Sequence, residues 1–223
     1  MRDVDLAVFD LAGTTVEDRG QVPEAFAAAL AGHGLTATPG QISAARGASK
    51  RQAILGLIPE GPDQATQAAE VYATFQDRLA GLFAAGGVRS IPGTEPVFTW
   101  LRERGARIAL NTGFDRELTT LLLDALHWDS RAFDAVVCGD DVRQGRPAPF
   151  MIFRAMELAG VVAVQRVAVV GDTILDLQAG ANAGVKWNIG VLTGAHDRAT
   201  LETAPHTHLI GSVAELPDCL GTI

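Results

Sequence analysis

Residues 4–15 read VDLAVFDLAGTT, an apolar run that ends on Asp10 and a Gly-Thr-Thr turn. Apart from Asp5, the segment Val4–Phe9 has the apolar composition of a buried strand. Similar short runs recur along the chain and alternate with longer helical patterns, which predicts parallel strands joined by crossover helices. The further strands are expected at Arg107–Asn111, Asp134–Val137, Arg166–Val170, Trp187–Leu192 and His208–Ile210.

Amphipathic helices are expected between these strands. Thr94–Arg104 ends at Gly105, and Asp115–Leu126 begins with an acidic N-cap. One segment breaks the alternation, because Gln21–Ala85 shows an Ala-rich helical pattern without a convincing strand. The predicted fold class is therefore α/β, a Rossmann-like doubly wound parallel sheet core with an inserted α-helical cap domain.

The linkers Glu17–Gly20 and Gly86–Gly93 set the predicted domain boundaries. We expect the catalytic core at residues 1–18 and 87–223 and the cap domain at residues 19–86. Within the cap, the apolar helix Val71–Phe83 could form the face of a homodimer or pack inside the molecule, and internal packing is the better interpretation.

Composition limits the class of partner. The chain has 223 residues, 48% of them hydrophobic, and a formal net charge of -8, which argues against a nucleic acid or an anionic membrane as partner and favours a small molecule. Only Cys138 and Cys219 occur, far apart in sequence. The start MRDVDLAVFD lacks the long apolar region of a signal peptide, so a cytoplasmic location is expected.

Polar residues follow three of the predicted strands, whose carboxyl ends would form one ligand-binding edge. Asp10 follows the first strand, Thr112–Gly113 the second, and Asp172 the fourth, with Asp176 one helical turn further on. Arg146 stands in a Gly-Arg-Pro segment before the helix that begins PAPFMIF.

These side chains suit phosphoryl transfer. The Asp10 carboxylate can attack phosphorus and form an aspartyl phosphate, which divides one difficult displacement into two easier ones. Thr112–Gly113 and Arg146 can bind phosphate oxygens. Asp10 and Asp172 offer hard oxygen ligands for Mg²⁺, and Asp176 would lie behind them and orient a water or Asp172.

The ordered set resembles the haloacid dehalogenase superfamily over essentially the whole chain. The matching segments are FDLAGTT from Phe9, NTGF from Asn111, GRPAPF from Gly145 and VGDTILDLQAGANAG from Val170. Polar residues that merely cap helices would explain each position singly, but not four motifs in order. The resemblance implies a Mg²⁺-dependent hydrolase with Asp10 as the nucleophile, and with Asp10, Asp172 and the backbone carbonyl of Ala12 as metal ligands.

Two departures from the usual superfamily pattern resemble one branch. Ala12 stands where most members carry a general acid, and Arg146 stands where they carry a lysine. Both departures match the pattern of the phosphonatases (phosphonoacetaldehyde hydrolases), which this chain resembles. The phosphonatase pattern begins with Asp-x-Ala-Gly-Thr and has Gly-Arg-Pro later in the chain. That resemblance implies cleavage of the C–P bond of a small 2-oxoalkylphosphonate, assisted by a cap lysine that forms a Schiff base with the substrate carbonyl.

The corresponding lysine here is Lys50, in the segment GASK at Gly47–Lys50. The pattern Ser-Lys-Arg-Gln predicts Ser49 as an N-cap and Lys50 as the first residue of a helix. The helix dipole and the charges of Arg46 and Arg51 are expected to lower the pKa of Lys50 and so to favour its nucleophilic amine form. The alternative is that Lys50 lies on the solvated surface of the cap.

The cap also departs from the phosphonatases. Arg46, Ala53 and Phe114 replace a common Met, His and Tyr, so the expected proton shuttles are missing and the substrate is expected to be a relative of phosphonoacetaldehyde. Arg46 could contact an additional anionic or polar group. One alternative is a phosphomonoester phosphatase that tolerates Ala12 because its leaving group is acidic. The other is a catalytically weak binding protein, although a binding module does not need this set of polar residues.

Overall fold

The computed structural model describes residues 4–221 and contains a six-stranded sheet in the order β3-β2-β1-β4-β5-β6. Every neighbouring pair of strands is parallel. The strands are β1 (Leu6–Asp10), β2 (Arg107–Asn111), β3 (Ala135–Val137), β4 (Val167–Gly171), β5 (Trp187–Val191) and β6 (His208–Ile210). All six predicted strands are confirmed to within two residues at each end. The predicted core also includes residues 1–3 and 222–223, which lie outside the described range.

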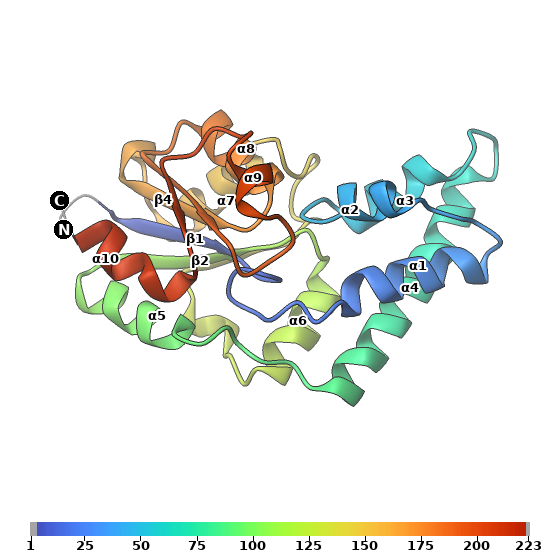
Figure 1. Ribbon diagram of the computed structural model, residues 1–223, viewed down its shortest axis with the longest axis horizontal. Coiled ribbons are helices and arrows are strands. Elements are labelled where there is room, and N and C mark those ends of the chain that lie inside the picture. Colours follow the sequence, from blue (N-terminus) through green and yellow to red (C-terminus); the bar gives the residue numbers. More distant parts are fainter. Residues whose placement is uncertain (1–3, 222–223) are drawn as a thin grey trace.

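Helices cover both faces of the sheet, as Figure 1 shows. Leu6 and Val8 of β1 pack in one layer with α7 (Phe150–Ala159) and α8 (Ile174–Ala183). The alternate residues Ala7 and Phe9 pack in the other layer, with α5 (Thr94–Glu103) and α10 (Leu216–Gly221). Successive side chains of a strand point to opposite faces, so a strand covered on both faces must be apolar throughout. This explains the unbroken apolar run of β1.

The predicted helix termini are confirmed. Helix α6 (Arg116–Ala125) begins after Asp115, whose Oδ1 accepts a hydrogen bond from the Leu118 N–H at 3.0 Å. Helix α5 ends just before Gly105, which adopts a left-handed φ of 77°. A short helix α9 (Arg198–Leu201) precedes β6.

The segment between β1 and β2 is helical, as predicted. It contains α1 (Gln21–Gly32), α2 (Pro39–Ala44), α3 (Lys50–Leu57) and α4 (Gln64–Gly86), which lie to one side of the sheet in Figure 1. Helix α1 packs on α4, with the rings of Phe26 and Phe75 6.1 Å apart. Because Val71, Phe75, Leu79 and Phe83 are buried, the apolar face of α4 packs inside, and the predicted homodimer would need another surface. The domain boundaries at 18/19 and 86/87 stay a prediction.

The register of the sheet brings the polar strand ends together. Asp10 is paired with Asn111 of β2, and Phe9 is paired with Val170 of β4. Thr112 and Asp172, which follow these two strands, therefore lie on either side of the end of β1. The inserted helices stand over this carboxyl edge.

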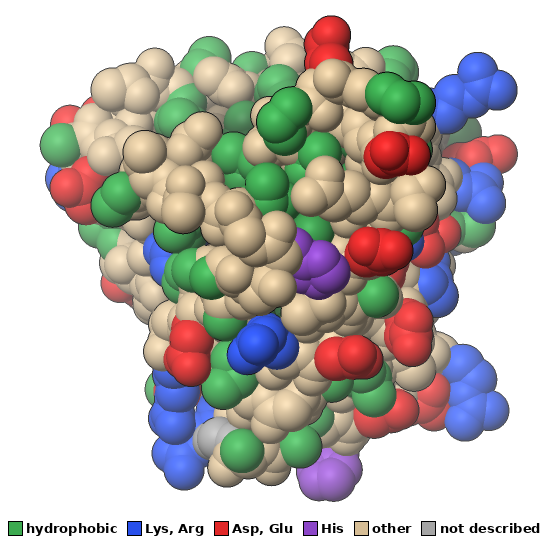
Figure 2. All heavy atoms as spheres, turned by 90° about the vertical axis from the view of Figure 1, so that its right-hand side faces the viewer, with side chains coloured by type: hydrophobic (Ala, Val, Ile, Leu, Met, Phe, Trp, Pro, Cys, Tyr) green, Lys and Arg blue, Asp and Glu red, His purple; other side chains and the backbone are tan. Residues whose placement is uncertain are grey.

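The surface seen from the helical end of the molecule is mixed in character. Figure 2 shows acidic and basic side chains interspersed with apolar ones over this face. Within residues 4–221, the structure contains no helix that is both long and apolar enough to cross a membrane.

Candidate active site

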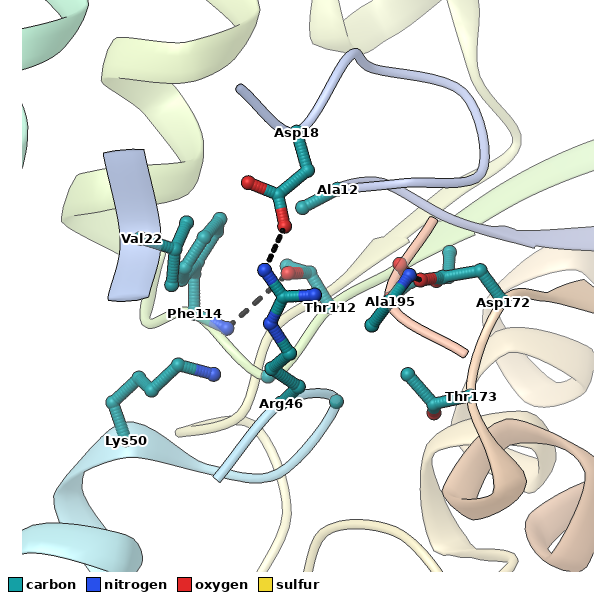
Figure 3. Close-up of a pocket in the computed structure, with 13 residues that line it drawn as sticks. Ala12, Asp18, Val22, Arg46, Lys50, Thr112, Phe114, Asp172, Thr173 and Ala195 are labelled. Atoms are coloured by element: carbon teal, nitrogen blue, oxygen red, sulfur yellow. Dashed lines mark hydrogen bonds and ion pairs between the residues drawn. The ribbon is translucent and has the colours of Figure 1, made fainter. Parts of the chain in front are cut away.

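A pocket lies at the carboxyl edge of the sheet, beneath the loop that joins α2 to α3, and encloses about 410 Å³ including the part open to solvent. Six predicted site residues line it: Asp10, Ala12, Lys50, Thr112, Gly113 and Asp172. The other lining residues are Asp18, Val22, Arg46, Gly47, Phe114, Thr173 and Ala195. Figure 3 shows that side chains from the helical insertion and from the sheet edge meet in this space. The structure therefore unites residues from both predicted domains in one site.

Asp10 is held by an arginine from a distant part of the chain. Arg146 Nη2 donates to Asp10 Oδ1 at 2.6 Å, and both side chains are buried. Burial raises the pKa of Asp10 to about 6, and the nearby positive charge of Arg146 opposes that rise. The ion pair fixes one oxygen of the predicted nucleophile, so Arg146 can orient the carboxylate for attack.

Arg146 and Asp176 lie behind the pocket and do not line it. Arg146 Nη1 pairs with Asp176 Oδ1 at 2.6 Å, and Nη2 also donates to the carbonyl and side-chain oxygens of Asn111 at 3.0 Å each. Asp176 Oδ2 accepts from the Thr173 N–H and hydroxyl. Asp176 thus lies behind the pocket, where its partners are Arg146 and Thr173 and not Asp172, and its predicted role stays a prediction. The NH₂ groups of Arg146 donate to these protein acceptors. The predicted contact of Arg146 with a phosphate oxygen stays a prediction.

The buried ion pairs of Arg146 lead to a stability prediction. Arg146→Met should lower the free energy of unfolding by about 3–5 kcal/mol, because it leaves the Asp10 and Asp176 carboxylates buried without their partner. Urea unfolding at pH 7 measures the loss. The matched control is Arg154→Met, which removes an exposed ion pair with Glu157 and should cost at most about 1 kcal/mol. Equal losses in the two variants would contradict the prediction.

Asp172 is the second carboxylate of the pocket. Its oxygens accept hydrogen bonds from the Thr14 hydroxyl at 3.1 Å and from the Ala195 N–H at 2.6 Å. Burial, together with the negative charges of Asp10 and Asp176, raises the pKa of Asp172 well above its ordinary value. The site therefore holds two carboxylates that repel each other.

The donor set fits the predicted Mg²⁺. Within residues 4–221, no group of three His, Cys, Asp or Glu side chains is arranged to hold a metal ion. Mg²⁺ does not need such a group, because it commonly binds one or two carboxylates and keeps several waters. Asp10, Asp172 and the Ala12 carbonyl would supply only oxygen ligands, and a cation beside the two carboxylates would offset their repulsion.

The loop after β2 meets the cap loop directly. The Thr112 hydroxyl accepts from the Phe114 N–H at 3.2 Å, which leaves its own hydrogen to donate into the pocket. A Cβ at Gly113 would lie 2.5 Å from the Ala48 carbonyl oxygen, and one at Gly47 would lie 2.5 Å from the Thr173 hydroxyl. Only glycines permit this close approach, so the structure has the cap closed over the predicted phosphate-binding loop.

Lys50 extends from the start of α3 into the pocket, as Figure 3 shows. Its side chain is buried, and Nζ donates to the carbonyls of Ala45 at 2.8 Å and Ala48 at 3.2 Å. The ring of Phe114 lies 5.8 Å from Nζ. The alternative of a lysine on the solvated cap surface is therefore wrong. The predicted N-cap is confirmed, because the Ser49 hydroxyl accepts from the Gln52 N–H.

The pKa of Lys50 is lowered to about 8, as predicted in direction. The main cause is burial, which was not part of the sequence-based expectation. Arg146 and Arg46 add like charge, whereas Asp10 and Asp18 oppose the shift. Arg51 is not among these main causes, and its guanidinium stacks 4.3 Å from the ring centroid of Tyr72.

Asp18 and Ala195 are pocket residues that the sequence reasoning missed. Asp18 Oδ2 pairs with Arg46 Nη2 at 3.1 Å, in a segment interpreted only as a linker. Ala195 follows β5, and its N–H binds Asp172. A Cβ on the neighbouring Gly194 would lie 1.9 Å from Asp172 Oδ2. The signal was available, because both segments follow strands at the edge where ligands bind.

Known proteins are similar to this chain in sequence and in architecture. The family model for haloacid dehalogenase-like hydrolases matches residues 4–184. The phosphonoacetaldehyde hydrolase of Bacteroides fragilis is 33% identical over 218 residues, which cover 92% of this chain and 82% of that protein.

Two solved structures share the fold at 22% identity. A hydrolase from Pseudomonas syringae has a TM-score of 0.87 and covers 98% of this chain and 99% of its own. A phosphonoacetaldehyde hydrolase-like protein from Oleispira antarctica has a TM-score of 0.83, with coverages of 98% and 92%.

The chain belongs to the haloacid dehalogenase-like hydrolases, the class defined by its sheet, its inserted helices and the carboxylates at the strand ends. Within that family its similarity to the phosphonoacetaldehyde hydrolases makes it a member of the phosphonatase-like branch.

Proposed function

We propose that the protein is a Mg²⁺-dependent hydrolase that cleaves the C–P bond of a small 2-oxoalkylphosphonate, either phosphonoacetaldehyde or a relative. The observation that carries the proposal is the burial of Lys50 in the same pocket as Asp10, with a pKa lowered to about 8. Burial costs the charged form of a lysine its hydration, whereas it favours the neutral amine that can attack a carbonyl.

The proposed reaction uses the two residues at opposite ends of one bond. The Lys50 amine adds to the substrate carbonyl and releases water, which leaves an iminium. An Asp10 oxygen then attacks phosphorus, the C–P bond breaks, and its electron pair moves toward the iminium nitrogen to form an enamine. Water hydrolyses the aspartyl phosphate to phosphate and Asp10. Protonation of the enamine carbon and hydrolysis of the resulting iminium release the aldehyde or ketone and free Lys50.

The other residues position these groups. Arg146 fixes Asp10 Oδ1, and Asp176 fixes Arg146. The hydroxyl of Thr112 and the backbone of Gly113 would bind phosphoryl oxygens. Asp10, Asp172 and the Ala12 carbonyl would hold Mg²⁺, which when bound offsets the charge of the phosphoryl group and the carboxylates.

A substrate comparison tests the proposal. Released phosphate is measured with phosphonoacetaldehyde, longer 2-oxoalkylphosphonates and a set of sugar phosphates, each with Mg²⁺ and with EDTA. We expect the highest kcat/KM on a carbonyl phosphonate and loss of activity in EDTA. Higher kcat/KM on phosphomonoesters would favour the phosphatase alternative, and absence of turnover on every compound would favour a binding protein.

Residue 12 leads to a further prediction. Ala12 lines the pocket beside Asp10 but cannot donate a proton. Ala12→Asp should raise kcat/KM for phosphomonoesters relative to carbonyl phosphonates by about 10²-fold, because an alkoxide leaving group needs a proton whereas an enamine does not. Ala12→Asn is the control, since it has similar size but no acidic proton. Parallel changes on both substrate classes would mean that residue 12 does not set the leaving group.

A further inference from the structure

Arg46 is a cap residue that the proposed reaction does not use. It lies in the loop between α2 and α3 and lines the pocket together with Lys50 and Asp172. Figure 3 shows its guanidinium between Lys50 on one side and Asp172 and Ala195 on the other. The side chain is 26% exposed, so most of this charge is withdrawn from water.

The position of the Arg46 guanidinium is set by one carboxylate. Asp18 Oδ2 pairs with Arg46 Nη2 at 3.1 Å, and Asp18 Oδ1 accepts from the Gly20 N–H at 2.9 Å. Among the described groups, which leave out the side chains of residues 43, 44 and 86, the remaining N–H groups of Arg46 have no hydrogen-bond acceptor. An arginine has five N–H donors in a fixed fork, so Arg46 keeps donors for a ligand in the pocket.

The second arginine near the site is differently placed. The NH₂ groups of Arg146 donate to Asp10, Asn111 and the cap carbonyl of Gly47 and pair with Asp176, and Arg146 does not line the pocket. Binding a substrate oxygen through an NH₂ group of Arg146 would require that group to release one of these acceptors, and the unpaired Nε of Arg146 is buried behind the pocket. Arg46 requires no such exchange.

We propose that Arg46 binds an oxyanion of the substrate, and that Asp18 is the positioning residue that holds its guanidinium over the pocket. The oxyanion is a phosphoryl oxygen or a second anionic group of the substrate, such as a carboxylate. Because Arg46 belongs to the cap loop, the contact forms only when the cap is closed. The inference rests on the proposed function in taking a phosphonate as the ligand, but its test does not need turnover.

Calorimetric binding to the Mg²⁺-loaded protein tests the contact with two probes. Methylphosphonate carries only the phosphonyl group, and phosphonoacetate adds a carboxylate; neither has an aldehyde or ketone to condense with Lys50. Arg46→Met keeps the length of the side chain and removes its donors. We expect the Kd of at least one probe to rise about tenfold or more, as for loss of a charge-assisted hydrogen bond.

Three further variants separate binding from general effects. Arg46→Lys restores the charge and should recover part of the affinity, and Asp18→Asn should weaken the same probe by a smaller factor. Arg51→Met is the control, because it removes a cap cation that stacks on Tyr72 outside the pocket lining. The Kd values of the Arg51→Met variant for both probes should stay within about twofold of those of the original protein.

The pattern of losses identifies the oxyanion. Weaker binding of both probes assigns the contact to the phosphonyl group, and weaker binding of phosphonoacetate alone assigns it to the carboxylate. If Arg46→Met changes neither Kd more than Arg51→Met does, the proposal is wrong. Failure of the proposed function is a separate outcome. In that case the protein binds these probes but releases no phosphate from any carbonyl phosphonate.

Discussion

Asp10→Asn should reduce turnover of every substrate by about 10⁴-fold or more, because it removes the nucleophile while keeping the shape of the side chain. The amide oxygen can still accept the hydrogen bond that Arg146 Nη2 donates to Asp10 Oδ1. The packing of the pocket should therefore persist, and the loss should fall on kcat. Phosphate release under single-turnover conditions measures it.

Asp5→Asn is the matched control for this variant. Asp5 precedes β1 at the opposite end of the strand and pairs with Arg166. Arg166 also holds the pKa of Asp5 below its ordinary value. The control thus removes a paired carboxylate next to the same strand, far from the pocket, and kcat should change by less than about twofold. If Asp10→Asn turned substrate over at the rate of the control, Asp10 would not be the nucleophile.

The sheet and its strand ends could be predicted because both depend on local patterns. A strand covered on both faces is apolar throughout, and parallel strands place their carboxyl ends at one edge. These two rules located Asp10, Thr112 and Asp172 at a single site without any knowledge of tertiary contacts. The pocket lining bears this out.

The partners of the charged residues could not be predicted in the same way. Arg146 pairs with Asp10 across 136 positions of sequence and forms a second ion pair with Asp176. Its side chain therefore turns behind the pocket, although its residue type equally suited a phosphate ligand. The pairing of Asp18 with Arg46 could not be predicted for the same reason, since this contact forms only when the cap loop folds back over the sheet.

The burial of Lys50 shows the limit of local reasoning about pKa. The sequence placed a lysine at a helix N-terminus next to two arginines, and both features predicted the direction of the shift. The main cause is desolvation, which arises because the cap loop closes on the sheet edge. Sequence spacing alone does not reveal which side of a helix terminus is covered in this way.

Lys50→Arg should abolish cleavage of carbonyl phosphonates, with a loss of about 10⁴-fold or more, because a guanidinium keeps the charge but forms no imine. The structure supports a nucleophilic amine here, since Nζ lies in the Asp10 pocket and donates only to backbone carbonyls among the contacts described for residues 4–221. Single-turnover phosphate release measures the loss.

The pH dependence of kcat/KM is an independent test of the role of the Lys50 amine. Only the neutral amine attacks a carbonyl, and a pKa lowered to about 8 means that the neutral fraction rises as pH approaches 8 and levels off above it. The kcat/KM for a carbonyl phosphonate should therefore rise with a midpoint near that pKa. A lysine with the ordinary value of 10.5 would give a rise that continues through pH 10.

Borohydride trapping tests the imine directly. Lys50 and Lys186 are the two lysines of the chain, so a reduced adduct is easily assigned by peptide mass. Borohydride with a carbonyl phosphonate should fix one substrate-derived fragment on the peptide that carries Lys50. Lys186→Arg, which changes the lysine beside the ring of Trp187, should leave both the adduct and the turnover intact. If no adduct forms on Lys50 and Lys50→Arg still cleaves carbonyl phosphonates, the amine takes no part in the reaction. The buried lysine would then serve to bind substrate charge, and the phosphatase alternative would explain the site better.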